Sequence, residues 1–172
     1  MAILSDRDIR EYLHQGKIRI EPLKDEQIGP ASVDLTLSEE WWFFKPAYKG
    51  KTVDLIKIGF EKAMEKTRAA SIKLKPGEMC LGKTVEKITL APDILGRLEG
   101  RSRYARMGLS VHITSSLVQP GSDNHQVLEI VNSAPFAVRL HAGMRVSQVV
   151  FYELRQETSK PYARYGKLAA KQ

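Results

Sequence analysis

Three arginines and a serine stand together near the middle of the chain, flanked by two glycines, in the run Gly-Arg-Ser-Arg-Tyr-Ala-Arg-Met-Gly. The basic residues of this run are Arg101, Arg103 and Arg106. Guanidinium groups pair with phosphate through two hydrogen bonds at once, and a hydroxyl such as that of Ser102 can add a further one. The segment therefore predicts a phosphate-binding turn, and an ordinary solvated turn is the alternative.

A single carboxylate interrupts the apolar stretch Gln-Val-Leu-Glu-Ile-Val-Asn further along the chain. Because alternate residues of a strand share a face, Glu129 and Val127 are expected on one face and Leu128 on the other. Desolvation raises the pKa of a carboxyl group unless a cation lies beside it, and a carboxylate tuned in this way suits general acid–base chemistry. A structural ion pair, for example with Arg106, is the alternative.

Several common kinds of catalytic centre are missing from the sequence. Zinc hydrolases and deaminases need three or four closely spaced His or Cys ligands, whereas the histidines here are scattered at His14, His112, His125 and His141. The phosphate cradles G-x-x-x-x-G-K-[ST] and G-x-G-x-x-G do not occur, and neither does the nucleophile motif G-x-S-x-G. The sequence therefore predicts no zinc site.

The elements that must position these groups are mostly short strands. Ser5 and Asp8 have the spacing of a helix cap and predict one helix of about nine residues that ends at Gly16. A second helix is predicted over residues 57–70. Apolar alternation or short apolar runs predict strands at 18–21, 33–38, 41–44, 72–74, 79–81, 85–88, 94–98, 108–118, 126–132, 136–140 and 144–152. Such a series is typical of a mainly β sandwich or closed barrel.

The length of 172 residues fits one domain. We expect that domain at residues 1–155, where the alternation stops. Residues 156–172 are rich in lysine, arginine and tyrosine, and they predict a mobile basic tail.

The charge balance of the chain is basic. There are 27 Lys and Arg against 20 Asp and Glu, a net charge of +7. This excess suits a polyanionic partner such as nucleic acid or a nucleotide, and a solvated basic surface is the alternative. The lone cysteine, Cys80, favours a reducing cytoplasm. The charged N-terminus and the lack of a long apolar stretch predict neither a signal peptide nor a membrane span.

Several segments, taken in order, make the chain resemble the dCTP deaminase branch of the dUTPase superfamily. Each alone is a weak signal, but together they cover most of the chain. They are Leu-Ser-Asp-Arg-Asp-Ile near the start, Gly-Pro-Ala-Ser-Val-Asp-Leu-Thr-Leu at 29–37, Gly-Arg-Ser-Arg-Tyr-Ala-Arg-Met-Gly-Leu at 100–109, Val-His-Ile-Thr-Ser at 111–115, Gln-Pro-Gly at 119–121, Val-Leu-Glu-Ile-Val-Asn at 127–132 and Pro161-Tyr162.

The resemblance implies a distorted, dUTPase-like β-barrel with one or two short helices, assembled as a homotrimer with nucleotide sites between subunits. It implies zinc-independent hydrolytic deamination of dCTP to dUTP and ammonia, which would feed dUMP and dTTP synthesis. It also implies Mg²⁺ bound through the triphosphate, with no metal ligand from the protein side chains.

The resemblance also assigns roles by position. Glu129 would take a proton from water and later protonate the leaving amine, while Ser102, Arg106 and the backbone carbonyl of Ser115 would hold that water against C4 of cytosine. The tail would close over the nucleotide. The residues expected to bind the nucleotide are Arg101, Ser102, Arg103, Arg106, Gln119, Val127, Leu128, Glu129, Tyr162, Arg164 and Tyr165.

This chain departs from the family pattern at several positions. Gln119 stands where an Asp usually meets the sugar hydroxyl, Ser122 replaces an aromatic residue, and Asn124 replaces a glycine. Arg103 replaces the more common second serine, and Leu168 lies about where the tail usually has a glutamine. The base and phosphate chemistry therefore match the family, whereas sugar recognition and the tail differ from it.

Three other functions stay open at this stage. The first is a dUTP diphosphatase, or a bifunctional enzyme that forms dUMP, although Gln119 cannot serve as a base there. The second is a non-catalytic nucleotide-binding homologue. The third is a basic barrel that binds single-stranded nucleic acid through Trp41 and Trp42, but these residues lie in an apolar run more typical of a core. We therefore expect dCTP or dUTP, rather than nucleic acid, as the partner.

Overall fold

The structure is a computed structural model that describes residues 2–165, and it is mainly β, as predicted. The strands are β1 (Ile18–Glu21), β2 (Ile28–Gly29), β3 (Ser32–Phe44), β4 (Met64–Arg68), β5 (Ser71–Leu74), β6 (Met79–Leu90), β7 (Ile94–Gly100), β8 (Leu109–Val111), β9 (Leu117–Val118), β10 (Asp123–Asn132), β11 (Val138–His141) and β12 (Arg145–Glu153). The α-helices of the described part are all short: α1 (Asp6–His14), α2 (Phe60–Ala63), α3 (Ser102–Ala105) and α4 (Tyr162–Tyr165).

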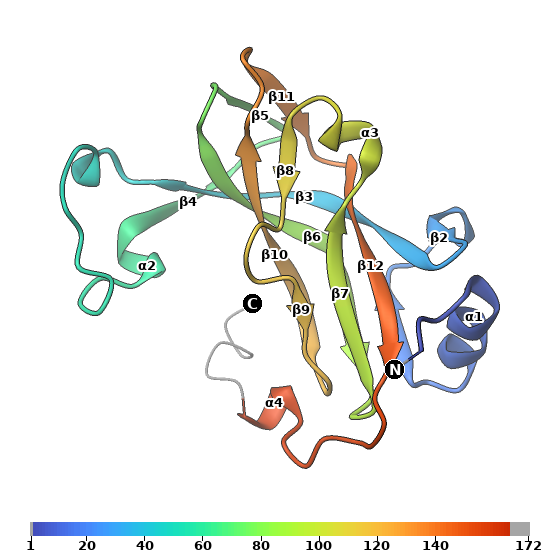
Figure 1. The fold of residues 1–172 in the computed structure, drawn as a ribbon. Helices are drawn as coiled ribbons and strands as arrows, with labels where there is room; N and C mark the ends of the chain where they lie inside the picture. The colour runs from blue at the N-terminus through green and yellow to red at the C-terminus, as the bar shows by residue number, and fades with distance from the viewer. Residues whose placement is uncertain (1, 166–172) are drawn as a thin grey trace.

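One large antiparallel sheet curls into a partial barrel (Figure 1). Its strands follow the order β8-β10-β6-β3-β12-β7-β9, while β5 and β11 form a separate ribbon. The two end strands, β8 and β9, are consecutive in the chain and are joined by residues 112–116 alone. A connection this short can join both edges only if the sheet curls back on itself. The predicted barrel is confirmed in this form.

The core lies inside this curl, where β3, β6 and β10 turn their buried residues toward one another. The burial of β10 alternates along its length, so Leu128 and Ile130 are fully buried and Glu129 points to the other side. Trp41 is fully buried on β3, and its indole N–H donates to the carbonyl of Ala69 at 2.9 Å. The alternation read from the sequence of β10 is thus confirmed.

Helix α1 begins as predicted. The hydroxyl of Ser5 accepts a hydrogen bond from the backbone N–H of Asp8, and the Asp8 carboxylate accepts one from the backbone N–H of Ser5. This capping box satisfies donors that the helix itself leaves unpaired. The helix ends before Gly16, which takes a φ of +72°.

Two predicted elements are wrong. Residues 57–70 do not form one helix, because α2 is a single turn and residues 64–68 pair with the end of β3 as β4. Pairing with a neighbouring strand outweighs local helix propensity in this segment. Residues 108–118 do not form one strand either, because the chain leaves β8 at His112 (φ +57°) to cross between the sheet edges.

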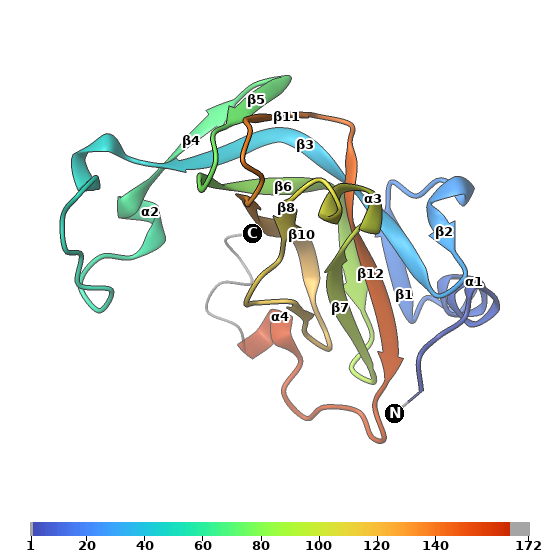
Figure 2. The same cartoon turned by 45° about the horizontal axis from the view of Figure 1, so that its top comes forward.

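Two segments outside the strands of the barrel differ in where they lie. The segment between β3 and β4 projects away from the sheet and carries α2 (Figure 2). The described part of the tail instead lies against the barrel, since the N–H groups of Tyr162 and Ala163 donate to the carbonyls of Pro120 and Gly121 at 2.9 and 3.0 Å. The mobility of the tail stays a prediction. Residues 166–172, including Leu168, lie outside the described residues.

Candidate active site

A cavity of about 570 Å³ opens beside β10 and the loop 112–116. The neighbouring strands β10, β6, β3 and β4 of one sheet provide much of the lining, with Glu129, Leu81 and Trp42 in one cross-strand row, and the loop and α2 provide further residues. Its lining residues are Glu40, Trp42, Phe60, Glu61, Met64, Lys66, Leu81, Lys83, His112, Ser115, Leu117, Val118, Gln119, Ser122, Asn124, Gln126, Val127, Glu129 and Tyr162.

The carboxylate of Glu129 is held in place on the cavity wall by Thr114. The backbone N–H of Thr114 donates to Oε2 at 3.1 Å, and its hydroxyl lies 3.0 Å from both carboxylate oxygens. The backbone carbonyl of Glu129 accepts from the N–H of His112 at 2.8 Å. The loop therefore forms hydrogen bonds with both the main chain and the side chain of Glu129. Among the described residues no cation forms an ion pair with it, so the alternative of an ion pair with Arg106 within one chain is not observed.

His112 lies in the cavity wall next to Glu129. Its backbone has a positive φ of 57°, which histidine tolerates better than most residues do. Its Nδ1 atom is buried and has no hydrogen-bond partner among the described residues. Burial lowers the pKa of His112, and the charge of Glu129 opposes that effect without cancelling it. We infer that this ring is neutral at neutral pH.

The part of the lining that comes from β3, β4 and β6 combines charge with an aromatic face. The Oε2 atom of Glu40 lies 2.9 Å from the Nζ of Lys66 and 3.6 Å from the Nζ of Lys83. The hydrogen bond from Lys66 lowers the pKa of Glu40. The Lys66 ammonium also lies 5.2 Å from the centre of a Trp42 ring. Trp41 is therefore the core residue of the aromatic run, and Trp42 belongs to the cavity.

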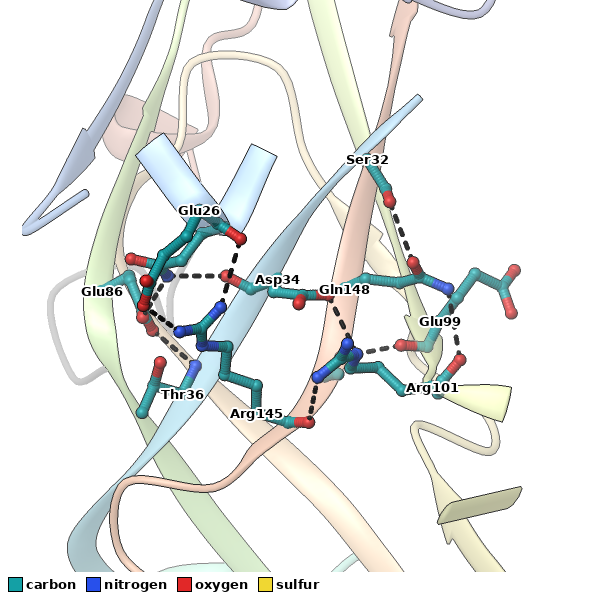
Figure 3. Close-up of polar contacts among 12 residues, drawn as sticks. Glu26, Ser32, Asp34, Thr36, Glu86, Glu99, Arg101, Arg145 and Gln148 are labelled. Carbon is teal, nitrogen blue, oxygen red and sulfur yellow. Dashed lines mark hydrogen bonds and ion pairs between the residues drawn. The ribbon is translucent and has the colours of Figure 1, made fainter. Parts of the chain in front are cut away.

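The arginine-rich turn lies elsewhere in the same chain. It forms α3, and Ser102, Arg103 and Arg106 are exposed there, outside the cavity lining. Arg101, which precedes α3, turns back into the protein. Its Nε lies 3.0 Å from a carboxylate oxygen of Asp34, and its Nη1 donates to the carbonyl of Arg145 at 3.1 Å (Figure 3). In this chain Arg101 therefore anchors the turn.

A mostly buried polar cluster surrounds this anchor (Figure 3). Glu86 accepts hydrogen bonds from the side chain of Gln27 and from the backbone N–H of Thr36, both at 2.8 Å. Burial raises the pKa of Asp34 above its ordinary value, because the charges of Arg101 and Arg145 offset the desolvation only in part. The cluster fixes Arg101 to β3 and β12, and thereby fixes the base of α3.

The structure brings some of the predicted site residues together and leaves others apart. Glu129, Ser115, Gln119, Val127 and Tyr162 share the cavity. The side chain of Leu128 is buried in the core, so only its main chain can face a ligand. Arg164 is exposed on α4 outside the lining, and Tyr165 ends the same helix. These site assignments remain predictions.

Some residues of the cavity, and Thr114 that holds Glu129 from beside it, were not expected from the sequence. Thr114 and His112 lie within the Val-His-Ile-Thr-Ser segment, which was the available signal for both. Trp42, Lys66 and Lys83 carried no such signal, because their place near Glu129 depends on which strands pair: β6 lies between β10 and β3, and β4 pairs with β3.

Other reactive groups are limited in the part of the chain that the structure describes. Burial raises the pKa of Cys80 to about 12, so this thiol is a poor nucleophile. No group of three or more His, Cys, Asp and Glu side chains is placed to hold a metal ion within residues 2–165. Over the same range no helix is both long and apolar enough to cross a membrane.

The comparisons with known proteins agree with this fold and this motif order. The family model described as dCTP deaminase-like matches residues 3–154. The chain therefore belongs to the dCTP deaminase-like family, and the predicted resemblance is confirmed.

Two curated relatives are similar over most of their length. A protein of Methanosphaera stadtmanae named "dCTP deaminase, dUMP-forming" is 39% identical over 94% of this chain and 84% of its own. A "dCTP deaminase" of Rhodospirillum rubrum is 40% identical over 93% of this chain and 87% of its own. The crystal structure of 2'-deoxycytidine 5'-triphosphate deaminase from Agrobacterium tumefaciens has a TM-score of 0.67 at 22% identity. The match covers 87% of this chain and 47% of the Agrobacterium chain. This likeness shows a shared fold.

Replacing Asp34 by Asn should weaken the phosphate binding that the sequence predicts for the α3 turn. The amide lacks the charge that orients Arg101, and a charged hydrogen bond contributes about 1.5–3 kcal/mol. We therefore expect the affinity for inorganic triphosphate to fall by about tenfold to a hundredfold in isothermal titration calorimetry. Glu26→Gln is the matched control, because the pair of Glu26 with Arg145 is more exposed and contributes little. Unchanged affinity in Asp34→Asn would contradict the anchoring role.

His112 should make the protein less stable in mild acid. Its pKa in the folded chain lies below the ordinary value of 6.5, so the unfolded chain binds the proton more readily. The free energy of unfolding is therefore expected to fall as the pH drops below about 6.5. Urea unfolding at several pH values should show a smaller fall in His112→Asn, since Asn also tolerates a positive φ. His14→Asn, at an exposed helix position, should keep the full dependence, and equal slopes in both variants would contradict this assignment.

Proposed function

We propose that this protein catalyses the hydrolytic deamination of dCTP to dUTP and ammonia. Membership of the dCTP deaminase-like family supports this activity, as do the names of the two curated relatives. The observation that carries the proposal is the Glu129 carboxylate, held by two Thr114 donors on the wall of a nucleotide-sized cavity beside Ser115.

In the proposed reaction Glu129 acts as general base and then as general acid. It takes one proton from water as the water oxygen bonds to C4 of the cytosine, and it passes that proton to N3. Glu129 then takes the second proton from the new C4 hydroxyl and gives it to the amino nitrogen. The C4–N bond breaks, ammonia leaves, and C4 keeps the oxygen as a carbonyl. One water is consumed per ammonia and nothing is oxidised. The Ser115 carbonyl, Ser102 and Arg106 would orient the water.

We propose Mg²⁺ as a companion of the substrate triphosphate, with no zinc in the reaction. Mg²⁺ prefers oxygen ligands and commonly reaches proteins through substrate phosphates. The residues expected to meet those phosphates are Arg101, Ser102 and Arg103, with Tyr162 and Arg164 from the tail. Of these, Arg101 would act through its anchoring of α3. Residues 156–172 would close over the bound nucleotide.

We further propose a homotrimer in which each site is shared between subunits. In one chain the exposed α3 residues stand apart from the cavity that holds Glu129, so α3 of a neighbouring subunit would complete it. Exposed apolar side chains near these parts, Met107, Ile113 and Leu117, would be covered on assembly. We place the enzyme in the cytoplasm, which suits the single unpaired cysteine.

A second product pattern has direct support. The Methanosphaera relative is named as dUMP-forming and the Rhodospirillum relative is not, at nearly the same identity. Formation of dUMP would require a second water to attack phosphorus. Gln119 at the cavity edge offers no base for that step, so we favour dUTP as the product.

Product analysis tests these alternatives. The protein is incubated with dCTP and, separately, with dUTP in excess Mg²⁺, and the products are separated by ion-exchange chromatography. We expect ammonia and dUTP from dCTP, with added dUTP left intact, and no loss of rate with a zinc-specific chelator. dUMP and pyrophosphate would make the enzyme bifunctional or a diphosphatase. If neither nucleotide changes, the protein would be a non-catalytic nucleotide-binding homologue. Loss of activity with the zinc-specific chelator would contradict the zinc-free reaction.

A mixing experiment tests the shared site. Glu129→Gln should abolish deamination while nucleotide binding survives, because the amide is nearly isosteric but cannot act as a base. Arg106→Ala should be inactive because it removes the guanidinium group, at the end of α3, that would help to orient the water. Co-expressed mixed trimers would contain some sites with both wild-type residues, so part of the activity should return. Absence of any recovery in mixed trimers confirmed by mass spectrometry would place both residues in one chain's site.

A further inference from the structure

The segment between β3 and β4, residues 45–63, carries an exposed apolar turn. The backbone N–H of Lys57 donates to the carbonyl of Asp54 at 3.0 Å, so Leu55 and Ile56 occupy the centre of this turn. The Asp54 carboxylate accepts a further hydrogen bond from the N–H of Ile56 at 3.0 Å. Leu55 and Ile56 are 84% and 97% exposed. Small and polar residues dominate the centres of turns, so two large aliphatic side chains fixed outward there point to a partner surface.

The segment that carries this turn also borders the cavity. It projects from the sheet in both ribbon views (Figure 1, Figure 2), and its helix α2 supplies Phe60 and Glu61 to the cavity lining. In the same two views α3 lies away from the segment, so the two stand apart within one chain. A neighbouring subunit whose α3 enters the cavity would instead lie beside α2, and therefore next to the segment.

The end of α3 has exposed apolar side chains of its own. Met107, just after the helix, is 55% exposed, and Phe136 is 48% exposed. The N–H of Ser133 donates to the carbonyl of Gly108 at 2.8 Å, so the loop that leads to Phe136 begins beside the end of α3. One chain thus carries an apolar turn on the segment that borders its cavity, and apolar side chains on the side that carries α3.

We propose that residues 45–63 form a clasp for a second copy of this chain, in which the Leu55–Ile56 turn packs against Met107 and Phe136 of the partner subunit. The inference rests on the proposed shared site and deepens it, because the clasp would hold the neighbour's α3 at the cavity. The two surfaces differ, so the contact is heterologous, and a heterologous contact with the right rotation closes into a ring of three subunits.

The first experiment measures association of the subunits by sedimentation velocity over a range of protein concentrations. In the double variant Leu55→Ser, Ile56→Ser the turn keeps residues that suit it, and two apolar contacts are lost. We expect association to weaken about a hundredfold, and about tenfold for Ile56→Ser alone. Ile3→Ser is the matched control, because Ile3 is an exposed isoleucine outside the segment, and it should associate like the wild type. Wild-type association in a turn variant that is folded by circular dichroism would overturn the inference.

The second experiment identifies what the turn contacts. The photocrosslinker p-benzoylphenylalanine is placed at position 56, and the linked peptides are sequenced by mass spectrometry. We expect links to peptides of a second chain that contain Met107 or Phe136. Links to another surface of the second chain would overturn the inference. So would binding of the protein to vesicles of anionic lipid without any link between subunits, an outcome that would assign the turn and its exposed neighbour Lys57 to a lipid surface.

Activity on dCTP separates a role in assembly from a role in the reaction. The turn is outside the cavity lining, so at concentrations where the double variant is fully trimeric we expect its kcat to equal that of the wild type. On dilution its specific activity should fall at concentrations where the wild type keeps full activity. A lower kcat in intact trimers of the variant would overturn the assembly role.

The outcomes separate this inference from the proposed function. Sedimentation and crosslinking need no substrate, so they test the clasp whether or not dCTP is deaminated. Trimers that do not depend on the turn overturn the clasp and leave the deamination standing. A wild-type protein that stays monomeric overturns both the clasp and the shared site, and product analysis then still decides the activity.

Discussion

The connection between β8 and β9 is the constraint on which the candidate site depends. These strands are the two edges of one sheet, and residues 112–116 alone join them. The connection must leave β8 abruptly, which His112 achieves with a positive φ, and it must pass over β10 to reach β9. Thr114 then meets the carboxylate of Glu129. The loop that allows the sheet to curl is therefore also the loop that orients the candidate base.

The fold anchors the two parts of the proposed site separately. Glu129 depends on β10 and the loop, whereas α3 depends on Arg101, Asp34 and the carbonyl of Arg145. A chain that carries both halves but does not bring them together is well suited to a shared site, because association then joins two groups that are already rigid. Rigid groups lose little entropy when they meet a substrate, and this favours precise placement of water and phosphate.

Two sets of buried polar side chains lie near the parts of the proposed site. Glu86 and Gln27 support β3 close to Asp34, and they are paired with each other and with the main chain. Ser122, Asn124 and Gln126 are buried beside the cavity, where Gln126 is paired with Asn124 and with the Thr84 hydroxyl. The first set is directed at the protein's own backbone and supports the strand to which Arg101 is anchored.

The sequence by itself determined the class of fold and the motif order of the family. It also determined the helix that Ser5 and Asp8 cap, and the alternation that separates Glu129 from Leu128. These features depend on local periodicity, capping and short motifs, which neighbouring residues specify. Only the tertiary structure decided that residues 64–68 are a strand, that residues 112–116 cross between sheet edges, and that Arg101 turns inward to Asp34. It also decided that Trp42 and Lys66 share a cavity with Glu129. Each of these depends on contacts between residues far apart in the chain, and no local pattern encodes which distant strand a segment will meet.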